Sequence, residues 1–110
     1  MNRPLLIQLA HNSINEVLQA KNLIDKVALQ QEYPLLNESI PMTMKIFLDG
    51  KLRGYYEDLA RKSVLENIIQ GAKVAAFEDE NAEPLTLSEY FEIEIEISLQ
   101  TPEGVISHRA

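Results

Sequence analysis

Cysteine is absent from this sequence, and the absence excludes a disulfide framework, thiolate zinc sites and a cysteine nucleophile. Its four glycines stand singly, so there is no glycine-rich phosphate-binding loop. No apolar run approaches the roughly 20 residues that a membrane span needs. Polar residues interrupt the N-terminal segment every few positions, unlike the apolar core of a signal peptide. We therefore expect a single cytoplasmic domain without a membrane association.

The sequence also has fewer basic than acidic residues, and its formal net charge is −7. Nucleic-acid binding requires Lys and Arg to displace counterions, so this balance disfavours it. The charge is uneven: from Glu78 onward there are nine acidic residues and one basic residue, Arg109. Residues 45–62 are mildly basic, with five basic and three acidic side chains. These two regions would attract a partner or each other, or serve as ordinary solvated surfaces.

Two stretches have the periodicity of amphipathic helices. The first helix is expected from Pro4, a residue suited to a first helical turn, with residues 23–31 extending it or forming a second one. Ser63 and Glu66 fit a capping box at the start of another helix, and Thr86 and Glu89 fit a second. The first helix is predicted to bury one face: Leu6, Leu9, Ala10, Ser13, Ile14 and Val17. The helix that begins after Ser63 is predicted to bury an apolar face of its own and to lie close to a sheet. The residues of this face are Val64, Leu65, Ile68, Ile69, Ala72, Ala75 and Ala76.

Three strands are predicted, at 42–48, 51–56 and 91–99. Asp49-Gly50 indicates a turn between the first two. A two-residue loop would place Arg53 on the face of Met44 and Ile46. A three-residue loop, which we prefer, would group Leu52, Gly54 and Tyr56 there instead.

The clearest alternation in the chain lies in the third predicted strand, where large apolar residues alternate with glutamates and a serine. Burying a large aliphatic side chain stabilises by roughly 1.5–3 kcal/mol, so we expect these to face the core: Phe91, Ile93, Ile95, Ile97 and Leu99. The pattern as a whole predicts an α+β fold, with a small antiparallel or mixed sheet and helices packed on one face. His108 is expected in a tail.

Several stretches, in their order along the chain, resemble the AMMECR domain family, named for the AMME-syndrome chromosomal region. They are LLIQLAHNSI at 5–14, LDGKLRG at 48–54, AKVAAFED at 72–79, PLT at 84–86, EIS at 96–98 and TP at 101–102. The resemblance covers nearly the whole chain and implies a fold and an association rather than a reaction. Bacterial relatives in the family occur beside Memo-type and radical-SAM proteins.

The sequence departs from the family pattern at two places. After leucine–arginine–glycine the family continues with cysteine, isoleucine and glycine, whereas this chain has Tyr55, Tyr56 and Glu57. After Asp79 it has Glu80-Asn81-Ala82 in place of the family's usual proline, arginine and phenylalanine. We expect residues 1–110 to form one AMMECR-like domain that lacks the family's C-terminal half.

The strongest candidate ligand-binding residues are Arg53, Gly54, Tyr55, Tyr56 and Asp79. Arginine offers a planar fork of donors suited to carboxylate or phosphate, and glycine lets a backbone approach closely. These residues could form an anion site walled by the two tyrosines. Alternatively, Arg53 pairs with Asp79 or another acid and fixes the hairpin to the end of a helix.

Other polar clusters carry weaker signals. The acids at 78–80 fall short of the roughly six ligands of a calcium cage, and two distant histidines make a zinc site improbable. We therefore predict no metal and no cofactor. The leading hypothesis is an interaction module without catalysis, with a protein partner or a homodimer formed through an open sheet edge. The alternative is a small enzyme, or an enzyme component, that acts on an anionic metabolite through Arg53.

Overall fold

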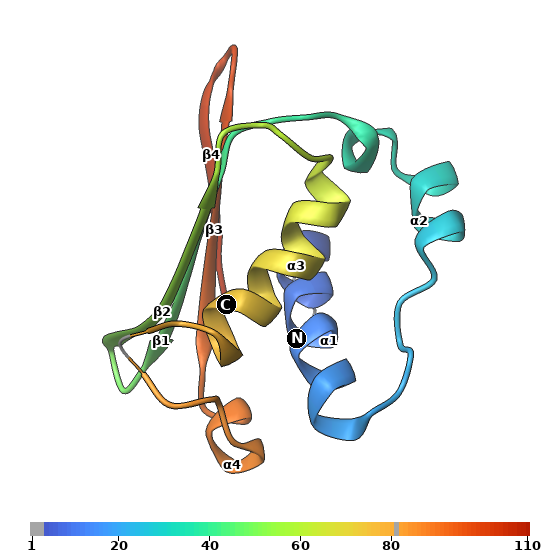
Figure 1. The fold of residues 1–110 in the computed structure, drawn as a ribbon. Helices are drawn as coiled ribbons and strands as arrows, with labels where there is room; N and C mark the ends of the chain where they lie inside the picture. Colours follow the sequence, from blue (N-terminus) through green and yellow to red (C-terminus); the bar gives the residue numbers. More distant parts are fainter. Residues whose placement is uncertain (1–3, 81) are drawn as a thin grey trace.

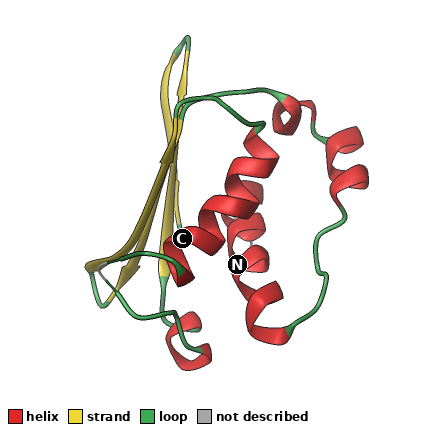
Figure 2. Ribbon diagram, in the orientation of Figure 1, coloured by secondary structure: helices red, strands yellow, loops and turns green. Residues whose placement is uncertain are grey.

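The chain forms one four-stranded antiparallel sheet with helices on one face (Figures 1 and 2), as the sequence predicts for an α+β fold. A computed structural model describes residues 4–80 and 82–110, so Asn81 lies outside the described residues. In chain order the elements are α1 (Leu5–Gln19), α2 (Lys26–Glu32), the 3₁₀ helix η1 (Pro34–Asn37), β1 (Met42–Leu48), β2 (Lys51–Asp58), α3 (Val64–Phe77), α4 (Leu87–Tyr90), β3 (Glu94–Thr101) and β4 (Gly104–Arg109).

The strand order is β2-β1-β3-β4, so β3 pairs directly with the first strand of the Asp-Gly hairpin. The isoleucines and Leu99 of the alternating segment are buried, whereas Glu94 on the other face is exposed. Phe91 was predicted to open this strand, but it ends α4 and is 76% exposed. The strand begins three residues later because the Thr86 capping box starts a helical turn that runs to Tyr90.

The hairpin register combines the two predicted alternatives. Leu48 pairs with Lys51, so the turn has two residues, and Ile46 pairs with Gly54. Phe47 pairs with Leu52, which leaves Arg53 as the extra residue of a β-bulge. Gly54 and Tyr56 therefore lie on the core face, as the preferred register predicted. The prediction for Leu52 is wrong, because before the bulge it lies on the open face and is 58% exposed.

Helix α3 lies close against β1 and β2, and α1 packs beside it over β3 (Figure 1). All seven residues predicted for the buried face of α3 are buried. A Cβ atom built on Gly54 would lie 2.1 Å from the carbonyl oxygen of Ala75. The two backbones thus meet with no room for a side chain, which explains both the glycine and the alanines opposite it.

Helix α1 differs from its prediction at three positions. Ile7 and His11 are buried although neither was assigned to the core face, and Val17 is exposed. The helix is covered from two sides, by α3 and by the sheet, so its buried sector is wider than a single stripe. Ser13 donates a hydrogen bond of 2.6 Å to the carbonyl oxygen of Ile69, which satisfies a hydroxyl buried between the two helices.

Strand β4 was not predicted, and His108 belongs to it rather than to a tail. Its six residues lack the alternation that marks β3, because the strand is exposed along most of its length. It pairs with β3 through a tight turn at Pro102 and Glu103.

Replacing Gly54 by alanine is expected to lower the free energy of unfolding by about 3 kcal/mol or more, because the new methyl group meets backbone atoms that cannot rotate away. Chemical denaturation would measure the change. Combining it with Ala75→Gly should restore nothing, since the clash involves the carbonyl group of residue 75. A Gly54→Ala protein with unchanged stability would contradict this close packing.

Gly71 provides the matched comparison within α3. A Cβ atom there would lie 2.5 Å from the Tyr56 ring, which is a side chain that can move or be removed. Alanine gains about 1 kcal/mol in helix propensity over glycine, so Gly71→Ala should be milder than Gly54→Ala. In a double-mutant cycle with Tyr56→Leu, we expect a favourable coupling of about 1 kcal/mol. Additive effects would show that the two residues do not collide.

Candidate functional site

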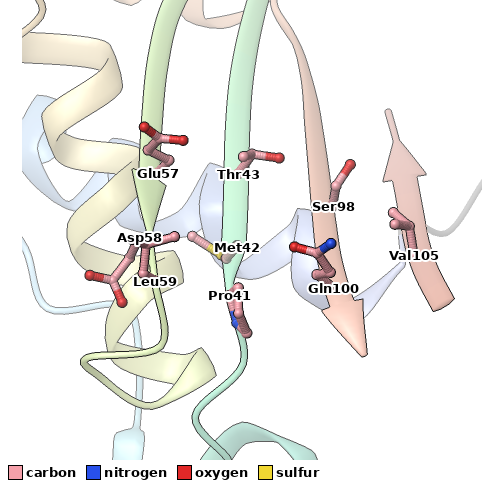
Figure 3. Close-up of a pocket in the computed structure, with 9 residues that line it drawn as sticks. All are labelled: Pro41, Met42, Thr43, Glu57, Asp58, Leu59, Ser98, Gln100 and Val105. Carbon is pink, nitrogen blue, oxygen red and sulfur yellow. The ribbon is translucent and has the colours of Figure 1, made fainter. Parts of the chain in front are cut away.

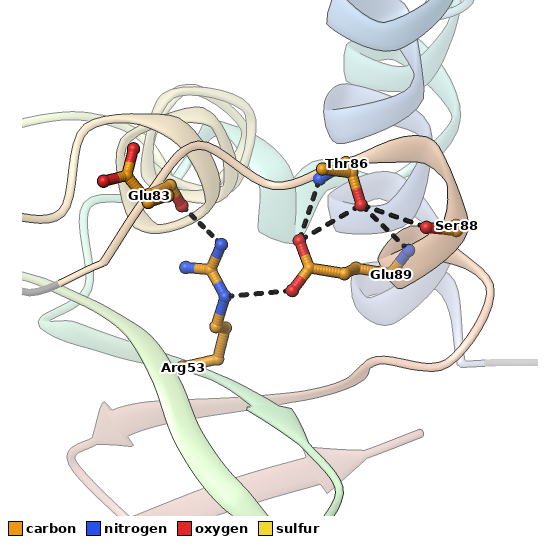
Figure 4. A network of polar contacts seen from close by, with 5 residues as sticks. All are labelled: Arg53, Glu83, Thr86, Ser88 and Glu89. Carbon is orange, nitrogen blue, oxygen red and sulfur yellow. Dashed lines mark hydrogen bonds and ion pairs between the residues drawn. The ribbon is translucent and has the colours of Figure 1, made fainter.

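Arg53 turns toward the segment that follows α3 (Figure 4). Its Nη2 donates to the carbonyl oxygen of Glu83, and its Nε lies 3.6 Å from Oε2 of Glu89. The side chain is 13% exposed, so it lies in a closed contact rather than in an open cleft. This arrangement matches the alternative in which Arg53 fixes the hairpin to the chain beyond the helix. Its Nη1 is buried and has no hydrogen-bond partner among the described residues.

Glu89 is held in place by the N-terminus of α4. One carboxylate oxygen accepts a hydrogen bond of 3.0 Å from the amide of Thr86, and the hydroxyl of Thr86 accepts one of 3.3 Å from the amide of Glu89. This is the complete capping box predicted from the sequence. Hydrogen bonds from the amide and then the hydroxyl of Thr86, together with the charge of Arg53, outweigh the opposing effect of burial and hold the pKa of Glu89 below its ordinary value of 4.5. The carboxylate is thus ionised and oriented toward Arg53.

Tyr55 and Asp79 meet at the outer edge of β2. The amide of Tyr55 donates to Oδ2 of Asp79 at 3.2 Å, so a side chain occupies the position that a neighbouring strand would take. The hydroxyl of Tyr55 donates to Glu57 at 3.0 Å. Burial and the neighbouring Glu57 raise the pKa of the Tyr55 phenol, which remains a neutral donor.

Tyr56 belongs to a different network on the helix side of the sheet. Its hydroxyl donates to the fully buried Asn67 at 3.0 Å, and Asn67 donates to Asp58 at 3.0 Å. Burial raises the pKa of Asp58, but hydrogen bonds from Asn67 and from the amide of Arg61 outweigh it, so this pKa is lowered. The structure therefore brings Arg53, Gly54, Tyr55 and Asp79 together and places Tyr56 elsewhere.

The open face of the sheet carries polar rows that the sequence prediction did not assemble. Register aligns one residue from each strand in a row, Tyr55, Lys45, Glu96 and Arg109. Arg109 lies 4.2 Å above the Phe47 ring and 3.2 Å from Glu94. Finding these rows requires the position of β4, which its sequence does not indicate.

A shallow depression of about 230 Å³ lies at one end of this face (Figure 3). Thr43, Glu57 and Ser98 approach it from three adjacent strands, with Leu59 and Val105 at its sides. Its volume is below the range of about 300–1,000 Å³ that is typical of ligand pockets. We assign no ligand to it.

The outer edge of β4 is the second surface that could bind a partner. Ile95 and Ala110 exchange both backbone hydrogen bonds, of 2.9 and 3.0 Å. Because hydrogen-bonded and non-bonded pairs alternate in an antiparallel ladder, the backbone groups of Val105, Ser107 and Arg109 point away from β3. No strand pairs with them among residues 4–80 and 82–110.

Two grooves follow β4 on the helix side. One, of about 840 Å³, is lined in part by Leu35, Ile40 and Ile106. The other, of about 220 Å³, lies between Leu35 and His108, next to the start of α1. The outer edge of β4 thus lies beside grooves lined by apolar side chains together with polar ones such as Glu38, Ser39 and Glu103.

Within the described part of the chain, no three His, Asp or Glu residues are placed to hold a metal ion. Nor does any described helix combine the length and the apolarity needed to cross a membrane.

Comparison with known proteins gives a family and a fold. A model of the AMMECR1 family matches residues 7–109. Five chains of solved structures match, among them the crystal structure of an uncharacterised protein from Pyrococcus horikoshii, at 24% identity and a TM-score of 0.75. The match covers 88% of this chain and 50% of that protein, so this chain spans half of its length. No curated protein matches.

The lowered pKa of Glu89 leads to an expected acid sensitivity. In the folded protein the pKa of Glu89 lies below 4.5. The contribution of its ionised carboxylate to the free energy of unfolding is therefore present above pH 4.5 and is lost as the pH falls through the folded-state pKa. Glu89→Gln should therefore weaken the dependence of unfolding free energy on pH below about pH 4.5. Thermal denaturation from pH 7 to pH 3 would measure this, with Glu92→Gln as the control on an exposed carboxylate. Identical slopes in the wild type and Glu89→Gln would contradict it.

Proposed function

The chain belongs to the AMMECR1 family, and from this premise we propose that it is a cytoplasmic protein-interaction module without catalytic activity of its own. The observation that carries the proposal is the outer edge of β4, with which no strand of the described residues pairs. A row of free backbone donors and acceptors can take up another strand, with the main chain supplying affinity and adjacent pockets supplying specificity. The edge and its grooves provide both.

The two edges of the sheet differ in a way that supports this function. Proteins commonly protect an edge strand with a bulge, a charge or a covering segment. The β2 edge has all three, in the bulge at Arg53, the carboxylate of Asp79 and the chain segment that carries Glu83. Strand β4 has no bulge, and Val105 and Ile106 are 65% and 47% exposed. Because the β2 edge is protected and the β4 edge is not, we infer that the β4 edge binds a partner.

The electrostatics of the Arg53 region point the same way. Two nitrogens of the guanidinium group already have a carbonyl oxygen and a carboxylate as partners, and the third, Nη1, is buried, so an anionic substrate would have to open this contact to reach it. Opening it would weaken the contacts with Glu83 and Glu89. A binding role at β4 needs no such rearrangement.

Ser107→Pro tests the proposal at a single backbone position. The amide of Ser107 points outward, so proline removes a donor from the free edge and leaves the hydrogen bonds to β3 intact. Ser107→Ala is the matched control, because both variants lose the hydroxyl contact of 2.8 Å with Ser98. In affinity capture from native lysate we expect a stoichiometric protein with the wild type and Ser107→Ala, and none with Ser107→Pro. Equal capture by all three would contradict a role for the edge.

A second candidate function is that of a small enzyme, or an enzyme component, acting on an anionic metabolite. It is favoured by the buried Nη1 of Arg53, which has no partner among the described residues. An unsatisfied buried donor costs about 1–3 kcal/mol, and an oxygen of a bound anion would relieve that cost.

Thermal-shift measurements with inorganic phosphate and a panel of small carboxylates would test this second function. Stabilisation of the wild type that disappears in Arg53→Ala, but persists in the control Arg61→Ala, would support it. Absence of any shift, or equal shifts in both variants, would count against it.

A further inference from the structure

Resting on the proposed interaction function, we infer that the partner is a second copy of this chain, joined by antiparallel pairing of the two β4 strands into one continuous eight-stranded sheet. The inference starts from Val105, Ser107 and Arg109, whose backbone N–H and C=O groups point away from β3. When two identical strands pair about a two-fold axis, these three residues of one copy must lie opposite residues of the other copy whose backbone groups also point outward. Only a few symmetric registers satisfy that condition.

Charge selects among these registers. Pairing centred on Arg109 would place two guanidinium groups directly opposite, which is destabilising. Pairing centred on Ile106 instead places Arg109 opposite Glu103 of the second copy, and it does so twice because of the symmetry. Glu103 directly precedes β4 and is exposed. Of the symmetric registers, this is the one that brings Arg109 next to an acidic residue, in the turn between β3 and β4 of the second copy.

To take part in this pairing, the Arg109 side chain has to turn outward from its position over the Phe47 ring, where its Nε and Nη1 face Glu94 and Glu96 at 3.2 and 3.9 Å. These contacts are on the exposed surface, where an ion pair contributes little to stability. Residues 104–110 contain no acid, in contrast to the acidic segment that precedes them. Two copies of a chain with a net charge of −7 thus approach each other through a strand without negative side chains.

The same register covers exposed apolar surface. Ile106 would lie opposite Ile106 of the second copy on the helix side, and Val105 opposite Ser107 of the second copy on the open face. A two-fold axis perpendicular to the sheet keeps the helices of both copies on one face. The grooves beside Leu35 in the two copies would therefore join beneath the paired strands.

Sedimentation velocity across a concentration series tests for the dimer. We expect the wild type and Ser107→Ala to shift reversibly from monomer to dimer, and Ser107→Pro to remain monomeric. A wild type that is purely monomeric up to about 1 mM would overturn the inference. So would a dimer that Ser107→Pro leaves unchanged.

Charge reversal tests the register. Arg109→Glu and Glu103→Arg should each weaken dimerisation about tenfold, because each change turns two attractive contacts into repulsive ones. The double variant should restore dimerisation to near the wild-type level. Circular dichroism would establish that Arg109→Glu, which also loses its contacts with Glu94 and Glu96, remains folded. A double variant as weak as the single ones would overturn the proposed register.

The outcomes separate this inference from the proposed function. A monomeric protein that still captures a different protein through β4, with loss in Ser107→Pro, overturns the second copy as partner and leaves the interaction function standing. A monomer whose capture is indifferent to Ser107→Pro overturns both.

Discussion

The backbone contact between α3 and β2 is the constraint on which the rest of the structure depends. At Gly54 the sheet approaches the carbonyl group of Ala75 more closely than any side chain would allow. This contact fixes the depth at which α3 lies on the sheet, and with it the point where the chain leaves the helix. The segment after Phe77 consequently starts beside β2, where Asp79 can accept from Tyr55 and Glu83 from Arg53. The β-bulge serves the same geometry, because it brings Gly54 to the helix side and turns Arg53 toward that segment.

Much of this fold could be predicted from the sequence because its signals are local. The alternation in β3 and the apolar face of α3 each reflect a single element with one buried side. The capping box predicted at Thr86 is complete, whereas at Ser63 only one half forms, in which the hydroxyl accepts a hydrogen bond from the amide of Glu66. Both caps are made within four residues of chain. The errors occur where a second element decides the outcome. The wide buried sector of α1 depends on α3 and the sheet together, the bulge at Arg53 depends on pairing, and β4 has no buried face from which a pattern could arise.

The candidate site shows the same division. Arg53, Gly54, Tyr55 and Asp79 could be selected from the sequence and do lie together, but their chemistry could not be assigned without the positions of Glu83 and Glu89. Neither of these residues lies near Arg53 in the sequence, and both come into contact with it only after α3 has packed. An arginine beside a glycine has the composition of an anion site. Because the capping box orients Glu89 toward Arg53, the contact between these two residues joins the hairpin to the start of α4.

The two sheet edges differ in what lies against them. At the β2 edge, Asp79 and Glu83 of the connection between α3 and α4 accept hydrogen bonds from Tyr55 and Arg53. Strand β4 forms the opposite edge, and no strand among the described residues pairs with its outer side. An exposed valine and isoleucine on such an edge favour association, since burying both removes apolar surface that the fold itself leaves in water. The packing that closes the Arg53 side of the sheet therefore supports the proposal that β4 is the edge at which another chain binds.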